Sequence, residues 1–285
     1  MRRSFLFVPG NRPDRYLKAC ASGAGSVIVD LEDAVAPAEK AAARRSLVEW
    51  LGAGPRVAVR VNAPGSEWFI DDVRACAHEA VSAIVLPKAE SAQDVERVTA
   101  ICGARPVLPM IETARGLWHA LAVAQAPNVR SLLFGSLDFQ ADLRASDDDL
   151  LFARSQLVLV SRVAGIEPPV DGVTQAIDDP ELLRRECRRA RQLGFGGKLC
   201  IHPRQVDVVN RCFAPSAEDR AWAQRVVDAF AQSSGNAARF DGKMIDRPVL
   251  LRAQAILAEA GDASDSRPPD GDRRDVRAGD AGRMK

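Results

Sequence analysis

The amino-acid sequence predicts an α/β fold, a (β/α)₈ TIM barrel with a C-terminal helical extension. Short β-rich runs alternate with longer amphipathic stretches along the chain. Eight strand–helix units of this repeat length fit a closed barrel better than an open sheet. With 285 residues, of which 47% are hydrophobic, the chain can bury a core of the size that a barrel requires.

The predicted strands are short apolar runs, and the last but one is the shortest. They are Ser4–Val8, Ser26–Leu31, Arg56–Val61, Ala83–Leu86, Pro106–Ile111, Ser131–Phe134, Pro169–Val170 and Gly197–Ile201. Between and after them lie helical patterns with capping residues or proline at their starts and glycine at several ends. These are Arg12–Ala21, Pro37–Trp50, Trp68–His78, Ser91–Cys102, Arg115–Ala124, Asp147–Ala164, Pro180–Leu193 and Arg204–Cys212.

The pattern changes after Pro215, which predicts three regions. Residues 1–214 form the catalytic barrel, and residues 215–260 form a helical extension or lid that contains the helices Ala217–Ala231 and Val249–Ala260. Residues 261–285 are mainly Asp, Arg, Gly, Pro and Ser. Because such a stretch buries too little apolar surface to offset its chain entropy, it is predicted to be a disordered tail.

Composition limits the classes of partner. A formal net charge of +1 argues against nucleic acid, so small ligands are expected. The six cysteines show no C-x-x-C pairing, which is typical of reduced thiols in a cytosolic protein. The apolar run Phe5–Val8 is too short for a signal peptide, and no stretch approaches a membrane span. The sequence therefore predicts a soluble, cytoplasmic protein that binds no membrane.

Charged and polar residues gather where the predicted strands end. They are Asn11, Arg12, Asp30, Glu32, Asp33, Arg60, Asn62, Lys88, Glu112, Ser136, Asp138, Asp171 and His202. The C-terminal ends of the strands carry the active site in barrels of this kind. Any one of these residues could be a cap or part of a rim salt bridge, but the whole set indicates a functional site.

Two carboxylates, Glu112 and Asp138, follow consecutive apolar runs. Because parallel strands separated by a helix lie side by side, their ends can meet. Two carboxylates with room for substrate and water suit a hard cation. In the alternative interpretation, Asp138 only caps the following turn and Glu112 pairs with an arginine.

Arg60 lies two strands earlier than Glu112 and points to the same side. Its guanidinium matches a substrate carboxylate through two hydrogen bonds. In the alternative it neutralises Asp30 or Glu32, which is compatible with substrate binding.

Lys88 suggests a different chemistry, because a desolvated lysine can form a Schiff base with a ketone. The acids Glu32, Asp33 and Glu112 would keep it protonated, so an electrostatic role is preferred. His202 could act as an acid or a base, but no second histidine supports a zinc site. The absence of G-x-S-x-G, P-loop and dinucleotide motifs argues against serine hydrolases, NTPases and Rossmann oxidoreductases.

An ordered series of motifs resembles the citrate lyase beta-subunit-like group of the HpcH/HpaI aldolase family. The match runs from about residue 4 to about residue 257. The motifs are Phe7-Val8-Pro9-Gly10, Asp30-Leu31-Glu32-Asp33-Ala34-Val35, Arg60-Val61-Asn62, Leu86-Pro87-Lys88, Ile111-Glu112-Thr113, Phe134-Gly135 with Asp138, Gly196-Gly197-Lys198, Ile201-His202-Pro203 with Gln205, and Met244-Ile245-Asp246. Each motif alone is common, but the ordered series is specific.

The resemblance implies a modified TIM barrel that assembles as a homotrimer or hexamer. It implies an enzyme that uses Mg²⁺ and acts on an acyl-CoA or acyl-carrier thioester and a small keto acid. By the same resemblance, Glu112 and Asp138 ligate the metal, and Glu112 also touches the substrate. Arg60 holds the keto-acid carboxylate, and Asp246 is the acid/base, reaching into the site of a neighbouring subunit.

The remaining expected contacts concern the substrate and CoA. Lys88, Glu32, Asp33 and Ser136 complete the expected substrate-binding set, and Lys198 and His202 are expected near CoA. One departure concerns the segment after Asp138. The family commonly continues Asp-Leu-Gly, whereas this chain has Asp142-Leu143-Arg144.

The expected reaction is the cleavage of a β-hydroxyacyl-CoA thioester of the citryl, citramalyl or malyl type into a keto acid and an acyl-CoA. A thioester hydrolase or a malate or citramalate synthase on the same scaffold is an alternative. A subunit that is active only within a citrate lyase complex is another.

Overall fold

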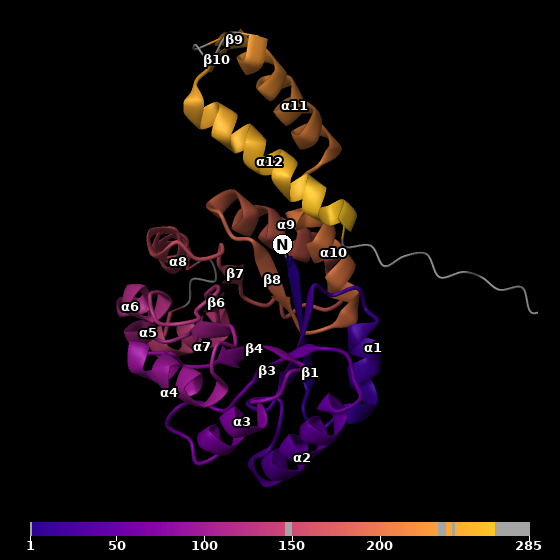
Figure 1. Cartoon of the computed structure of the whole chain (residues 1–285), viewed down its shortest axis with the longest axis vertical. Coiled ribbons are helices and arrows are strands. Elements are labelled where there is room, and N and C mark those ends of the chain that lie inside the picture. Colours follow the sequence, from indigo (N-terminus) through magenta and orange to yellow (C-terminus); the bar gives the residue numbers. More distant parts are fainter. Residues whose placement is uncertain (1, 146–149, 233–237, 241–242, 266–285) are drawn as a thin grey trace, which may run out of the picture. The chain divides into compact units, whose positions relative to one another are not determined.

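The computed structural model of the chain describes residues 2–145, 150–232, 238–240 and 243–265 (Figure 1). The chain divides into two compact units, Met1–Ala214 and Pro215–Lys285.

The first unit is built on a closed barrel of eight parallel strands, in which each strand pairs with the next and β8 pairs with β1 (Figure 1). The prediction of a (β/α)₈ barrel is confirmed. The strands are β1 Ser4–Pro9, β2 Ser26–Asp30, β3 Val57–Arg60, β4 Val81–Leu86, β5 Val107–Ile111, β6 Leu133–Phe134, β7 Val170–Asp171 and β8 Gly197–Cys200. Register places Pro9 beside Asp30 and Asp30 beside Arg60, so the polar residues at the strand ends lie level with one another.

Helices surround this barrel on the outside (Figure 1). They are α1 Tyr16–Cys20, α2 Lys40–Leu51, α3 Phe69–Ala75, α4 Ala92–Cys102, α5 Ala114–Trp118, α6 Ala120–Ala124, α7 Ser136–Leu143, α8 Leu151–Ala164, α9 Pro180–Leu193 and α10 Pro203–Phe213. Local signals set several boundaries. Ser91 and Asp94 form a capping box at the start of α4, and Asp179 caps α9 just before Pro180.

The core has two layers, because each strand is apolar on both faces. Ile28 of β2 belongs to the small cluster that fills the barrel together with Phe5, Val85 and Leu108. Val27 and Val29, which alternate with Ile28, belong to the larger cluster between the strands and the helices. Strands covered on both sides hold the rim residues on a rigid base.

The structure corrects the predicted position of Asp138. It contains a helix, α7, that the sequence did not indicate. β6 ends at Phe134, so Asp138 lies in the first turn of α7 rather than at the end of a strand. Two other predicted helices are shorter than expected: Arg115–Ala124 is divided into α5 and α6, and Trp68–His78 forms only as α3. α8 is described from Leu151, and the predicted start at Asp147 lies outside the described residues.

The second unit contains α11 (Ala217–Gln232), α12 (Arg247–Asp265) and an antiparallel pair of short strands, β9 (Ala238–Phe240) and β10 (Lys243–Ile245). Ala223, Val226 and Ala253 form its small apolar cluster. α12 continues past the predicted boundary at residue 260, and the rest of the predicted tail, 266–285, lies outside the described residues. Among the described helices, none has the length and apolar character needed to cross a bilayer.

Candidate active site

A cavity of about 410 Å³ opens at the C-terminal ends of the barrel strands. It is lined by six of the charged and polar residues that the sequence predicted at the strand ends: Asp30, Asp33, Arg60, Glu112, Ser136 and Asp138. The strand ends, and the first turn of α7 that carries Ser136 and Asp138, come from different parts of the sequence, and closure of the barrel brings them together. The location agrees with the general rule for barrel enzymes.

Glu112 follows β5 and is 1% exposed. Its Oε1 accepts a hydrogen bond of 2.7 Å from the backbone N–H of Lys88. Burial, assisted by the negative charges of Glu32 and Asp138, raises the pKa of Glu112 to about 8. A buried carboxylate that other acids repel is favourable only if a proton or a cation neutralises it.

The Glu112 and Asp138 pair fits a metal ion that keeps most of its coordination positions for water and substrate. Both line the same cavity. Within the described part of the chain, no group of three or more His, Cys, Asp or Glu has metal-binding geometry, which leaves this carboxylate pair as a site with few protein ligands. Oxygen ligands in small number suit Mg²⁺, which loses its water reluctantly.

The alternative roles that the sequence allowed for these two acids are not observed. No side chain caps the start of α7, so Asp138 is not its cap. Among the described ion pairs, none joins Glu112 to an arginine.

Arg60 lies at the end of β3 beside Asp30. Its Nε and Nη2 donate to the two Asp30 carboxylate oxygens, at 2.7 Å each. Its Nη1 lies 3.0 Å from Glu32 Oε2 and 3.3 Å from Asp33 Oδ2. The neutralising role is therefore present, and a substrate carboxylate would compete with Glu32 and Asp33. Substrate binding by Arg60 stays a prediction.

Lys88 follows β4 in the left-handed backbone conformation, with φ of 48°. This conformation is uncommon for a residue with a side chain. In this conformation the backbone N–H of Lys88 donates its hydrogen bond to Glu112. Its Nζ donates to Glu32 Oε1 at 2.9 Å. Burial opposes the charged form of Lys88, but the hydrogen bond to Glu32 and the charges of Glu32, Glu112 and Asp33 together outweigh it, and the pKa of Lys88 is raised. A protonated lysine is a poor Schiff-base nucleophile, which favours the electrostatic role.

The structure argues against a direct CoA contact by Lys198. The side chain is fully buried, and its Nζ lies 3.0 Å from Asp171 Oδ2 and 3.3 Å from Glu186 Oε2. His202 is half-buried and caps α10, where its Nδ1 accepts from the backbone N–H of Arg204 at 3.2 Å. The expected CoA contact of His202 stays a prediction.

Asp246 belongs to the second unit and is exposed. It precedes α12, and its Oδ1 accepts a hydrogen bond of 3.3 Å from the backbone N–H of Val249. Its role as the acid/base of the barrel site stays a prediction.

Arg144 stands where the family commonly has glycine. It ends α7 in the left-handed conformation, with φ of 52° and ψ of 36°. Glycine adopts this conformation without steric cost. The turn therefore has the backbone conformation that glycine favours. In the same segment, the Asp142 carboxylate accepts a hydrogen bond of 2.7 Å from the backbone N–H of Ala114, which links the end of α7 to the segment after β5.

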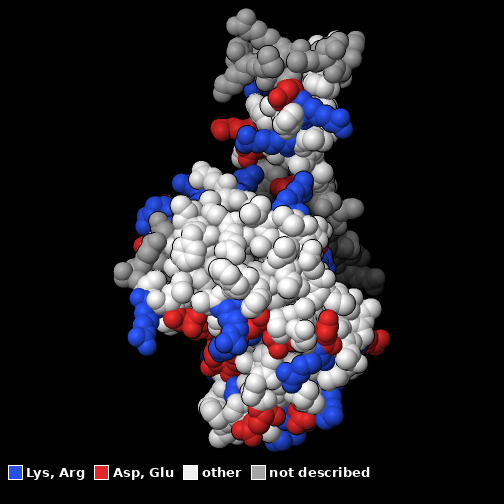
Figure 2. All heavy atoms as spheres, turned by 90° about the vertical axis from the view of Figure 1, so that its left-hand side faces the viewer, with Lys and Arg blue, Asp and Glu red and all other residues white. Residues whose placement is uncertain are grey.

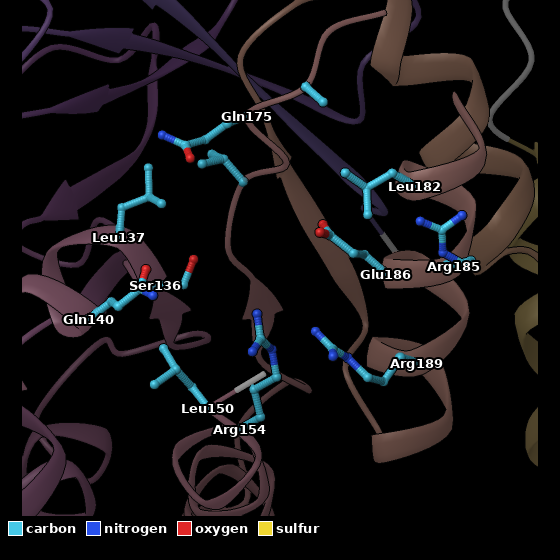
Figure 3. A pocket seen from close by; sticks show the side chains of 12 residues that line it. Ser136, Leu137, Gln140, Leu150, Arg154, Gln175, Leu182, Arg185, Glu186 and Arg189 are labelled. Atoms are coloured by element: carbon cyan, nitrogen blue, oxygen red, sulfur yellow. The ribbon is translucent and has the colours of Figure 1, made fainter. Parts of the chain in front are cut away.

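A second, larger cavity of about 640 Å³ lies beside the first and shares Ser136, Leu137 and Val173 with it. Figure 3 shows Arg154, Arg185, Arg189 and Glu186 around it. Sequence reasoning missed Arg154, which is 4% exposed and whose Nε donates to Asp171 at 2.8 Å. No sequence signal marks it, because it lies within an ordinary helical pattern.

Replacing Gly135 by alanine is expected to displace Glu112. A Cβ atom at position 135 would lie 2.3 Å from Glu112 Oε2 and 2.5 Å from its Cβ, which is too close for either atom. We expect the variant to fold and to lose Mg²⁺ affinity by about tenfold or more, as for other disturbed metal-ligand shells. Isothermal titration with Mg²⁺ measures this loss. Gly65→Ala is the matched control, since nothing lies within 4 Å of that added Cβ.

Without metal, the stability of the protein is expected to fall as pH rises from about 5 to about 8. In the folded state Glu112 has a pKa of about 8, whereas its ordinary value is 4.5. Between these values the folded state binds more protons than the unfolded state, so the free energy of unfolding decreases with pH. Melting temperatures in a chelator should show this slope, which Glu112→Gln should reduce. An equal slope in both proteins would contradict the assignment.

Comparison with known proteins supports the family. Residues 3–203 match the profile of the HpcH/HpaI aldolase/citrate lyase family, and residues 152–261 match that of a C–C bond lyase of the TIM-barrel fold. A citrate lyase subunit beta-like protein of Deinococcus radiodurans is 38% identical over 275 residues, which are 90% of this chain and 96% of the relative. A (3S)-malyl-CoA thioesterase of Cereibacter sphaeroides is 36% identical over 269 residues, covering 90% and 94%.

Solved structures agree with the sequence comparison. Protein CitE from Mycobacterium tuberculosis, in complex with magnesium, acetoacetate and coenzyme A, has a TM-score of 0.81 and 38% identity. The similarity covers 91% of this chain and 98% of that one. The resemblance drawn from the ordered motifs is confirmed, and this chain belongs to the HpcH/HpaI aldolase/citrate lyase family.

Proposed function

We propose that this protein is a Mg²⁺-dependent carbon–carbon lyase that cleaves a β-hydroxyacyl-CoA thioester into a keto acid and an acyl-CoA. The observation that carries the proposal is the pair of carboxylates, Glu112 and Asp138, in one cavity at the barrel mouth. Their mutual repulsion and the burial of Glu112 prepare the pair for a divalent cation. Family membership indicates lyase chemistry, and the CitE structures with magnesium support the choice of metal.

Each residue has a defined task in this reaction. Glu112 and Asp138 would hold the metal, which supplies Lewis acidity toward the oxygen that becomes the ketone. Arg60 would fix the adjacent carboxylate, and positioning of this kind accounts for a large share of many barrier reductions. Lys88, Glu32, Asp33 and Ser136 would line the substrate. When the Cα–Cβ bond breaks, the hydroxyl would lose its proton to solvent as its oxygen becomes the ketone oxygen. The electron pair of the broken bond passes to the thioester as an enolate, and protonated Asp246 would give its proton to Cα.

The thioester is proposed to be citryl-, citramalyl- or malyl-like. CitE complexes with acetoacetate, pyruvate and oxaloacetate support small keto acids as ligands. The relative named (3S)-malyl-CoA thioesterase supports the alternative of thioester hydrolysis on the same scaffold. A cytoplasmic location agrees with such substrates.

A panel of the three thioesters with Mg²⁺ tests the proposal. We expect keto acid and acyl-CoA to appear in equal amounts and neither to form in a chelator. Free CoA without keto acid would contradict the lyase and favour the hydrolase. No turnover of any thioester by the purified chain would favour a subunit that needs a larger complex.

We infer that copies of the chain meet on the barrel side formed by α5, α6 and α8. Figure 2 shows a broad area without charged side chains on the face that includes this side. Trp118, Phe152, Leu159 and Val163 are 82%, 57%, 64% and 60% exposed there. Large exposed apolar patches mark interaction sites. We expect a trimer or hexamer by light scattering, and Phe152→Glu with Leu159→Glu should lower the mass. A monomeric wild-type protein would contradict the assignment.

A further inference from the structure

A buried lysine stands close to the candidate site and has no role in the proposed function. Lys40 is the first residue of α2 and is only 6% exposed. The rest of the buried face of this helix is apolar, with Ala43, Leu47 and Leu51. Burying an ammonium group costs free energy unless hydrogen bonds and nearby charges compensate for it. The placement of Lys40 therefore calls for a specific explanation.

The ammonium group of Lys40 binds backbone rather than carboxylate. Nζ donates to the carbonyl oxygens of Leu31 at 3.0 Å and of Glu32 at 2.8 Å. It also lies over the ring of Trp68, 5.1 Å from the centroid. None of the ion pairs in the described structure includes Lys40, although acids are near enough to influence its charge.

The backbone N–H and C=O groups of Leu31 and Glu32 all have hydrogen-bond partners. The Leu31 N–H donates to the carbonyl of Arg60 at 2.9 Å. The Leu31 carbonyl also accepts from Asn62 Nδ2 at 2.9 Å. The Glu32 N–H donates to Asp30 Oδ1 at 2.9 Å. The Glu32 carbonyl also accepts from the Val35 N–H at 3.1 Å, so Lys40 adds a second hydrogen bond to each of the two carbonyls and links them to each other.

The carboxylate of Glu32, in this turn, contacts two basic side chains of the site, Lys88 and Arg60. Glu32 is 5% exposed. Its Oε1 accepts from Lys88 Nζ at 2.9 Å, and its Oε2 lies 3.0 Å from Arg60 Nη1 without the geometry of a hydrogen bond. A turn that moved by an ångström would loosen both contacts at once.

We propose that Lys40 is a positioning residue that fixes the Leu31–Glu32 turn, so that Glu32 holds Lys88 and Arg60 in place at the cavity. It acts through Glu32 and does not touch the substrate. Only its effect on turnover rests on the proposed function, since the fixing of the turn is a property of the fold.

Hydrogen exchange tests the fixing of the turn without any substrate. Lys40→Met keeps the length of the side chain and removes the ammonium group. We expect exchange of the Leu31 and Glu32 amides to accelerate about tenfold or more, because local opening becomes easier. The amides in the last turn of α2 should keep their rates. Lys18→Met, at an exposed position of α1, is the control and should leave the turn unchanged.

Unchanged exchange in the turn of folded Lys40→Met would overturn the proposal. If that variant does not fold, Lys40→Gln takes its place, because its amide can still donate to one carbonyl. Lys40→Arg keeps the charge and the donors, and it should restore part of the protection.

A double-mutant cycle with Glu32→Gln tests the route to activity. We expect Lys40→Met to lower kcat/KM by about tenfold in the wild-type background and by less than about twofold in Glu32→Gln, since residues that act through one another are not additive. Equal losses in both backgrounds would overturn the route through Glu32. A wild-type protein that turns over no thioester would refute the proposed function, while the exchange experiment would still decide the role of Lys40.

Discussion

Replacing Glu112 by glutamine is expected to remove metal-dependent turnover and to leave the barrel folded. The amide keeps an oxygen that can accept the hydrogen bond of 2.7 Å from the Lys88 backbone, so the local geometry is conserved. It removes one of the two carboxylates that would hold the metal. The metal is expected to lower the activation barrier by several kcal/mol, and about 1.4 kcal/mol corresponds to a factor of ten in rate. We therefore expect kcat/KM to fall by about a thousandfold or more.

The same substitution separates the metal site from the fold. The neutral side chain no longer opposes burial, so the melting temperature of Glu112→Gln at pH 8 without metal should equal or exceed that of the wild type. Addition of Mg²⁺ should raise the melting temperature of the wild type only. Glu96→Gln, at an exposed position of α4, is the matched control. Full activity of Glu112→Gln, or of the wild type in a chelator, would refute the metal assignment.

The barrel and most of its rim could be predicted because the relevant signals are local. Apolar runs that stop on a polar residue identify a covered strand and its end, and closure of the sheet into a barrel brings these ends together. Asp30 and Arg60 illustrate this, since both are strand ends and the parallel register makes them neighbours. Glu112 could be placed in the cavity for the same reason.

Side-chain partners could not be predicted in this way, because they depend on contacts between distant elements. Lys198 ends as a fully buried ion pair with Asp171, on the neighbouring strand, and nothing beside it in the sequence shows that its charge is neutralised. Lys40 had one usable signal, a charged residue in line with Ala43 and Leu47 on the buried face of a helix. Its hydrogen bonds to a distant turn could not be deduced from that signal.

The helix that begins after Gly135 could not be predicted from the sequence. The predicted strand ends at Phe134, as β6 does, but Asp138 was expected at the end of a strand rather than in a helix. The chain instead turns at Gly135, where any side chain would collide with Glu112. The close packing of Gly135 against Glu112 is a contact between distant residues that the sequence does not reveal, and Asp138 follows it in the first turn of α7.

Replacing Asp246 by asparagine is expected to slow turnover sharply while sparing Mg²⁺ and keto-acid binding. Asparagine retains the side-chain oxygen that accepts from Val249 N–H, and it is as good a residue before a helix as aspartate, so α12 should persist. It cannot exchange a proton with the thioester enolate. Loss of an acid/base group lowers kcat by about 10²- to 10⁴-fold. Asp228→Asn, exposed on α11 of the same unit, is the control, and unchanged kcat in Asp246→Asn would remove it from the mechanism.

Mixed oligomers test whether Asp246 serves the site of another chain. Glu112→Gln and Asp246→Asn chains are each expected to be inactive alone. If every site takes Glu112 from one chain and Asp246 from its neighbour, random co-assembly of equal amounts restores about one quarter of wild-type activity, because each of the two independent requirements is met with a probability of about one half.

The control for this experiment is a chain that carries both substitutions. Mixed with either single variant, it should restore no activity, since every site then lacks one of the two carboxylates. A mixture of the single variants that forms oligomers but stays inactive would show that each chain supplies its own Asp246.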